Sequence, residues 1–186
     1  MAARSGMTSL IGQFRALVDD AGTATFTDDR AQEILDDHRI DFYQDSLVVT
    51  PQQVASGSVA YHVYTSAYRY IEGTASGTVA FRLYDSFGTV ITSGYTEDMN
   101  RGRFVFTADQ VGSARYVDGR SYDLYGAVAA GWRQRASAQA DGYDFRVEGR
   151  QYSRSQWFKH CMDLAKFYES EARSTQAVIE RGDMIC

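Results

Sequence analysis

The sequence predicts a mixed α+β fold: a helical bundle of about four helices, drawn from both chain ends, that carries an inserted antiparallel β-meander. Apolar residues recur at helical spacing near both ends, whereas the period drops towards two in the middle of the chain, where short turn sequences recur. The regions expected are a helical body at 7–45 and 118–180, a β-rich insert at 46–117 and a C-terminal tail at 181–186.

Two helices are predicted before the insert. The first carries one apolar stripe and ends near Ala21-Gly22; its members are Met7, Leu10, Ile11, Phe14, Leu17 and Val18. The second begins at Thr27, whose hydroxyl can accept a backbone N–H. It continues through Ala31, Ile34 and Leu35 to His38 or Phe42. Each stripe alone would be marginal in water, so these helices are expected to pack with those at the other chain end.

Strands are predicted throughout the insert, at 58–71, 78–84, 89–95 and 103–107. The turns between them, Glu72-Gly73, Ser86-Phe87-Gly88 and Asn100-Arg101-Gly102, are short enough for hairpins, which predicts a meander. Apolar residues occur on both faces of several strands, so either both faces pack or one meets a partner. We therefore expect one face of the first strand to be an aromatic contact surface, formed by Tyr64, Tyr68 and Tyr70.

Two further helices, separated by a small hairpin, are predicted after the insert. The first has an apolar stripe of Leu124, Tyr125, Val128, Ala129, Trp132 and Ala136. Its Gly126 and Gly131 each lower helix propensity by about 1 kcal/mol relative to Ala, which indicates close packing of another backbone or tolerance at a surface. The hairpin turns at Glu148-Gly149. Ser153 and Gln156 form a capping box for the last helix, whose stripe is Trp157, Cys161, Leu164, Ala165, Tyr168 and Ala172.

Charge, hydropathy and cysteine content disfavour several classes of function. The net charge is −5 and no basic block is present, which disfavours a protein that reads DNA sequence. No apolar run approaches the roughly 20 residues that span a bilayer, so no membrane partner is expected, and 1–8 shows no secretory signal. Neither Cys161 nor Cys186 belongs to a C-x-x-C pair, which favours a reducing compartment over a disulfide framework or zinc site.

No residue is predicted to be catalytic. The acid pairs Asp19-Asp20, Asp28-Asp29 and Asp36-Asp37 are adjacent in the chain, so their carboxylates diverge on a helix, and solvated faces or helix ends explain them. His38 could join Asp41 at a metal, but no H-x-x-x-H pair supports this. His160 and Cys161 diverge by about 100° on a helix. Neither G-x-S-x-G nor a phosphate loop is present, so no enzyme activity, metal or cofactor is expected.

Two C-terminal segments, YDLYGAVAAGW at 122–132 and YDFRVEGRQYSRSQ at 143–156, resemble the head–tail connector (adaptor, or head-completion) proteins of tailed bacteriophages. In that family an Ala-rich helix ending in Trp precedes a hairpin of the F-x-x-x-G type, and a capped final helix opens with Ser-x-x-Gln. The segment Phe26-Thr27-Asp28-Asp29, which opens an early helix, also suits the family. The resemblance covers 7–45 and 118–180; the insert departs from the family's simplest members.

The resemblance implies a structural virion protein of the phage neck, made in the host cytoplasm. Its subunits would form a ring, typically a dodecamer in that family, below the portal protein, and would meet a tail-side adaptor, stopper or tail-tube protein. Double-stranded DNA would pass through the lumen without being read. A C-terminal extension commonly docks on the portal, and the matching stretch contains Val178, Ile179, Arg181, Met184 and Ile185. A frayed terminus is the alternative interpretation of this stretch.

Three other functions stay open on the sequence. One is a different assembly role, such as a tail-completion or tail-terminator protein. Another is a carbohydrate-binding β module on a helical base, in which Tyr64, Tyr68 and Tyr70 would be exposed around a groove. The third is a hydrolase whose acids converge only in three dimensions.

Overall fold

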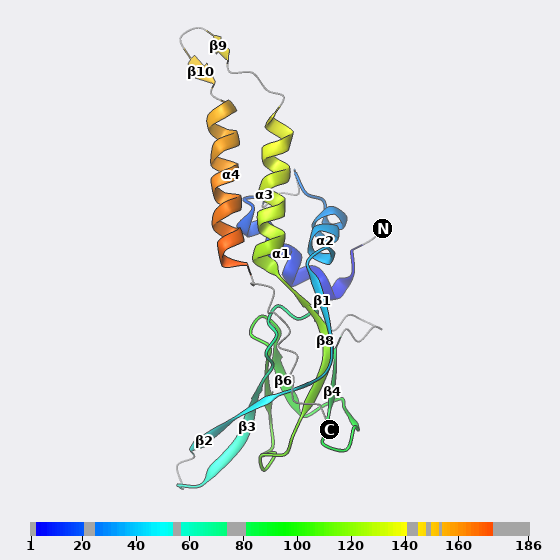
Figure 1. Ribbon diagram of the computed structural model, residues 1–186. Helices are drawn as coiled ribbons and strands as arrows, with labels where there is room; N and C mark the ends of the chain where they lie inside the picture. The colour runs from blue at the N-terminus through cyan, green and yellow to red at the C-terminus, as the bar shows by residue number, and fades with distance from the viewer. Residues whose placement is uncertain are drawn as a thin grey trace, which may run out of the picture.

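The computed structural model describes residues 3–20, 25–53, 57–73, 81–140, 145–147, 150–152 and 154–172. Within these ranges the chain forms four α-helices, two four-stranded antiparallel sheets and a two-stranded hairpin, which confirms the mixed α+β class. The helices lie at one end of the molecule and the two larger sheets at the other (Figure 1).

The helices are α1 (Thr8–Leu17), α2 (Asp28–Asp36), α3 (Leu124–Ala140) and α4 (Arg154–Glu171), and a 3₁₀ turn, η1 (Ser5–Met7), precedes them. The strands are β1 (Arg39–Ser46), β2 (Val48–Gln53), β3 (Val59–Thr65), β4 (Arg82–Tyr84), β5 (Val90–Ile91), β6 (Tyr95–Asp98), β7 (Arg103–Phe106), β8 (Tyr116–Tyr122), β9 (Phe145–Val147) and β10 (Arg150–Tyr152).

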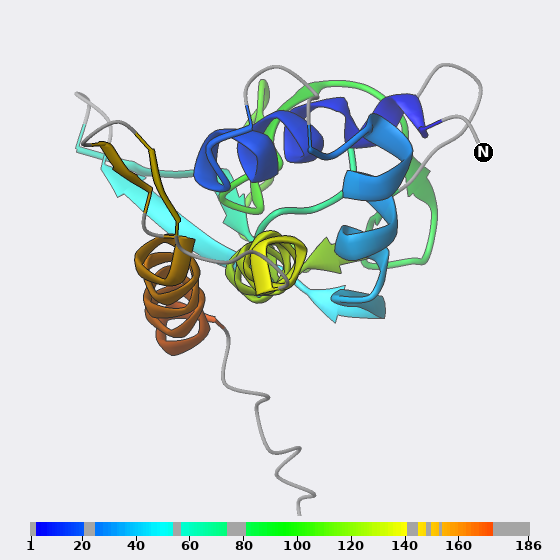
Figure 2. The same cartoon turned by 90° about the horizontal axis from the view of Figure 1, so that it is seen from above.

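Helix α3 occupies the centre of the helical end. Viewed along its axis, it has α4 on one side and α1 with α2 on the other (Figure 2). The stripe predicted for the first helix is buried here: Met7, Leu10, Ile11, Phe14 and Val18 lie in one core, and Leu17 packs against it. The same core contains Leu124, Val128, Trp132, Cys161 and Ala165, so both ends of the chain contribute to it.

Close packing around α3 explains one of its two glycines directly. A Cβ on Gly131 would lie 2.9 Å from the Phe14 ring and 3.0 Å from Val18 Cγ1. The close approach predicted at this position is therefore present, although the neighbours are side chains of the α1 region and not a bare backbone.

The second helix is shorter than predicted. The Thr27 hydroxyl accepts the N–H of Arg30 at 3.3 Å, as expected of the cap, but α2 ends at Asp36. The extension to His38 or Phe42 is wrong, because the chain enters β1 at Arg39 and pairs with β8. There Phe42 turns towards the β core, where its ring stacks on Tyr68 at 4.3 Å. The boundaries between the helical body and the β-rich insert were expected at residues 45/46 and 117/118. Strands β1 and β8 cross both of them.

The insert is not a single meander. The strand orders are β1-β8-β4-β5 and β2-β3-β7-β6, so the chain changes sheet four times between β1 and β8. Several strands of the insert carry apolar residues on both faces, and an aromatic core to which both sheets contribute explains them. Its buried members are Phe42, Leu47, Tyr64, Ile71, Phe81, Leu83, Phe104, Phe106 and Val117.

Two of the three predicted turns join paired strands. Residues 85–89 close the β4–β5 hairpin and 99–102 close the β6–β7 hairpin. Glu72-Gly73 does not close a hairpin, because β3 ends at Thr65 and Glu72 instead donates its N–H to Arg120 O at 2.9 Å. The predicted C-terminal hairpin is present as β9 and β10, whereas the serine of the predicted capping box lies outside the described residues.

Candidate functional site

The residues predicted to dock on a portal lie outside the described part of the chain. They are Val178, Ile179, Arg181, Met184 and Ile185. Their role stays a prediction.

The tyrosines predicted to form one contact surface have separate positions. Tyr64 is 0% exposed, and its hydroxyl donates to Ser113 O at 2.9 Å. Tyr64 was expected at a surface because it alternates with Val63, but both residues are buried, Tyr64 between the two sheets. Tyr68 stacks on Phe42, and Tyr70 makes an edge contact with Tyr125 of α3 at 6.2 Å. The prediction is therefore wrong for Tyr64, and the three residues do not form one face.

Tyr70 instead begins an aromatic strip across the base of the helices. We define the strip as Tyr70, Tyr125, Tyr168 and Phe167. Tyr125 stacks on Tyr168 at 6.2 Å, and Tyr168 contacts Phe167 at 5.2 Å. The first three are half-buried, whereas Phe167 is 56% exposed, so the strip runs from the interior to the outer side of α4.

Helix α4 is the outermost helix and packs chiefly against α3 (Figure 2). Besides Phe167, it exposes Trp157 (38%) and Phe158 (39%) near its N-terminal end. Trp157 lies beside Arg135, whose guanidinium is 5.7 Å from the centre of that ring and 5.0 Å from that of Trp132. A helix covered on one side that carries three large exposed aromatic side chains is typical of a contact surface.

Three of the acids considered for catalysis, Asp20, Asp28 and Asp36, have structural partners. Asp20 is 5% exposed and accepts the N–H groups of Phe26, at 2.7 Å, and Thr25. Burial raises the pKa of Asp20, but these two hydrogen bonds, with the charges of Arg135 and Arg15, outweigh it and hold the pKa below its usual value. Asp28 pairs with Arg15 at 2.5 Å.

His38 and Asp41, considered as metal ligands, do not belong to a ligand cluster. Over the residues that the structure describes, no group of three or more His, Cys, Asp or Glu side chains is arranged to hold a metal. Asp41 instead pairs with Arg39 at 3.1 Å.

A charged network that the sequence analysis missed joins the helical end to the sheets. Arg4 binds Asp36 of α2 through both terminal nitrogens, at 2.6 and 2.9 Å, and its Nε donates to Glu72 at 3.0 Å. The Tyr122 hydroxyl donates to the other Glu72 oxygen at 2.7 Å, and Arg120 lies 3.5 Å from that oxygen. We call Arg4, Asp36, Glu72 and Tyr122 the junction network.

Burial sets the chemistry of the junction network. Glu72 is 2% exposed and Tyr122 is 0% exposed. Desolvation first, and then the hydrogen bond to Glu72, raise the pKa of Tyr122 well above its usual value, so the phenol remains a proton donor. No local pattern marks the network, because its members are separated by 32 to 118 positions in the chain.

None of the helices within the described ranges is long and apolar enough to cross a membrane. Comparison with known proteins gave no family model, no curated protein and no solved structure that matches this chain.

Proposed function

We propose that this chain is a structural subunit of the head–tail connector of a tailed bacteriophage. In this proposal its copies form a ring below the portal protein, and the ring links the DNA-filled capsid to a tail-side adaptor, stopper or tail-tube protein. The helices α1 to α4 would form the connector body, and the two four-stranded sheets, which begin with β1 at Arg39 and end with β8 at Tyr122, would take the place of the insert.

The observation that carries the proposal is the succession of α3, the β9–β10 hairpin and α4. The two helices run antiparallel side by side, with the hairpin at their outer end (Figure 1). This is the order that the resemblance implies for 122–132 and 143–156. One detail differs, because Trp132 lies within α3, which continues to Ala140.

The exposed aromatic residues of α4 support assembly into a ring. Trp157, Phe158 and Phe167 are 38%, 39% and 56% exposed on the outermost helix. Aromatic side chains are enriched at protein interfaces, because they bury a large area at a small entropic cost. Phe158 and Phe167 are nine positions apart and so point to opposite sides of the helix, where the two neighbours of a subunit in a ring would cover one each.

The mass of the purified protein, alone and mixed with the portal protein of the same genome, tests the proposal. Native mass spectrometry and negative-stain microscopy are expected to find closed rings. A protein that stays monomeric even with portal present would contradict it. Rings that bind the end of a tail tube but not a portal would indicate the tail-completion or terminator role.

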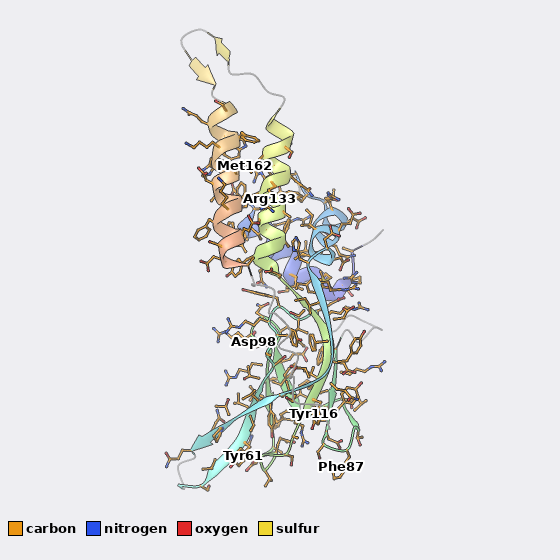
Figure 3. All side chains as sticks on the ribbon, in the orientation of Figure 1. Tyr61, Phe87, Asp98, Tyr116, Arg133 and Met162 are labelled. Carbon is orange, nitrogen blue, oxygen red and sulfur yellow. The ribbon has the colours of Figure 1, made fainter. Side chains whose placement is uncertain are left out.

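The contribution of α4 can be tested with side chains that the fold does not need. Changing Phe158 and Phe167 to Ser together is expected to convert rings to monomers that keep the far-UV circular dichroism spectrum of the folded chain. Phe87→Ser is the control, because Phe87 is 92% exposed at the turn between β4 and β5, far from the helices (Figure 3). Rings that survive the double change would place the interface elsewhere.

Removal of residues 177–186 tests the docking segment separately. The fold and the rings are expected to persist, while attachment to the portal weakens. Unchanged attachment in a pull-down with the portal would show that another element docks.

A further inference from the structure

A cleft lies on the outer side of the sheet β1-β8-β4-β5, at the end far from the helices. Tyr84 of β4 stands directly opposite Tyr116 of β8. Their neighbours Leu83 and Val117 are buried in the core, so the alternation of a strand places both tyrosines on the outer face. The cleft measures about 220 Å³ and is lined by Gln44, Tyr84, Asp85, Ser86, Gly88 and Tyr116. Figure 3 shows Tyr116 beside the Phe87 turn.

Asp118 fixes two walls of this cleft. One of its carboxylate oxygens accepts the Tyr84 hydroxyl at 2.7 Å, and the other accepts the Gln44 N–H at 2.6 Å. Gln44 has a φ of +47°, a conformation that residues with a side chain rarely adopt, at the irregularity between Phe42 and Asp45 in the β1–β8 pairing. The Tyr84 ring and the Gln44 backbone are thus positioned before any ligand arrives.

A third wall is a turn organised by Asp85. The Oδ1 atom of Asp85 accepts the N–H groups of Thr89 and Phe87, both at 2.8 Å. The hydrogen bond from Thr89, supported by that from Phe87, lowers the pKa of Asp85 below its usual value, so this carboxylate is ionised at neutral pH. It remains at the rim of the cleft, where it accepts hydrogen bonds and repels anions.

These groups select a class of ligand. Aromatic faces pack against apolar C–H surfaces, while a carboxylate and an amide accept and donate hydrogen bonds to hydroxyl groups. Neither Lys nor Arg lines the cleft, and behind Tyr84 the negative charge of Asp118 is accompanied by the positive charge of Arg82, so Asp85 is the group that disfavours phosphates and acidic sugars. The volume is below the roughly 300–1,000 Å³ of sites for drug-sized ligands.

We propose that this cleft binds one neutral sugar ring of a glycan, with the ring stacked on Tyr116 and its hydroxyl groups bonded to Asp85 and Gln44. The site differs from the face of Tyr64, Tyr68 and Tyr70 considered from the sequence. It belongs to the sheets alone, so it does not depend on the proposed connector role.

The test is a titration of the full chain with neutral tetrasaccharides of glucose, mannose and galactose, followed by NMR chemical shifts. A tetragalacturonate serves as the acidic comparison. At least one neutral sugar is expected to bind, and the acidic one is not. Tyr116→Ala is expected to weaken binding about tenfold, whereas Tyr116→Phe, which keeps the ring, retains most of it.

Two further variants distinguish a loss of binding from a loss of folding. Gln44→Ala removes a cleft amide and is expected to weaken binding severalfold. Tyr43→Ala is the matched control, because Tyr43 is 78% exposed on β1 but does not line the cleft. The proposal is overturned if none of the neutral sugars binds, or if binding is equal in wild type, Tyr116→Ala and Gln44→Ala. It is also overturned if only a protein partner protects the cleft from hydrogen exchange.

Discussion

The two cores of this protein are built on different principles. The helical core takes residues from both chain ends and is organised around α3, which touches each of the other helices. The β core lies in one continuous stretch of sequence, yet the chain passes between its two sheets four times. In the first core, a repeat of three and four residues identifies the buried positions. In the second, neighbours such as Val63 and Tyr64 are both buried, and only the sheet topology explains why.

Matched truncations in the two cores should have the largest effects. Phe14 and Phe104 are both 0% exposed, so Phe14→Ala and Phe104→Ala are each expected to reduce the free energy of unfolding by about 3–5 kcal/mol. Both tryptophans, Trp132 and Trp157, lie on helices, so their fluorescence follows the helical core alone. Urea titrations read by fluorescence are expected to shift for both variants. A fluorescence midpoint unchanged by Phe104→Ala would show that the cores unfold independently.

The junction network is expected to couple the two cores. Glu72→Gln removes a buried negative charge that Arg4 and Arg120 compensate. This change is expected to lower the free energy of unfolding by about 1–3 kcal/mol. Separate transitions for tryptophan fluorescence and far-UV circular dichroism should then appear. Glu169→Gln is the control, since its pair with Arg133 is exposed and contributes at most about 1 kcal/mol. An equal loss of unfolding free energy in both variants would argue against a coupling role.

The helical core should carry an acid-sensitive contribution from Asp20. Its folded-state pKa lies below the unfolded value of about 3.9, so its stabilisation is complete above that pH and is lost as the pH falls through the folded pKa. Asp20→Asn is expected to cost about 1–2 kcal/mol at pH 7, and the difference from wild type should shrink below about pH 4. Urea titrations at pH 7, 5 and 3 measure it. A pH-independent difference would contradict this assignment.

Two glycine changes should have the smallest effects and opposite signs. Gly12→Ala in α1 meets nothing within 4 Å, so it should stabilise the protein by up to about 1 kcal/mol. Gly131→Ala gains the same propensity but pushes its Cβ against Phe14 and Val18, for a net loss of about 1 kcal/mol. Melting temperatures of the two variants check the signs. Stabilisation by both would show that the helical core is looser than described.

The sequence predicted the parts of the fold that local patterns control. Thr27 was identified because a helix start has a chemical signature, and the stripe from Met7 to Val18 because burial follows the helical period. The end of α2 was missed, since Phe42 fits a helical stripe as well as a strand, and pairing with distant β8 decides between them. Tyr64 was misplaced for the same reason. The junction network and the Tyr84–Tyr116 cleft arise only when remote strands pair, so no single segment shows them.

The contact of η1 with the segment after β3 has an evolutionary consequence. Gly73 donates its N–H to Gly6 O at 3.3 Å, and a Cβ on Gly6 would lie 2.4 Å from Gly73 O. Beside this contact, Arg4 binds Glu72. A side chain at position 6 would separate the two backbones and weaken the ion pair. Diverged relatives should therefore keep or lose Arg4, Gly6 and Glu72 together, a covariation that could identify them where overall similarity has vanished.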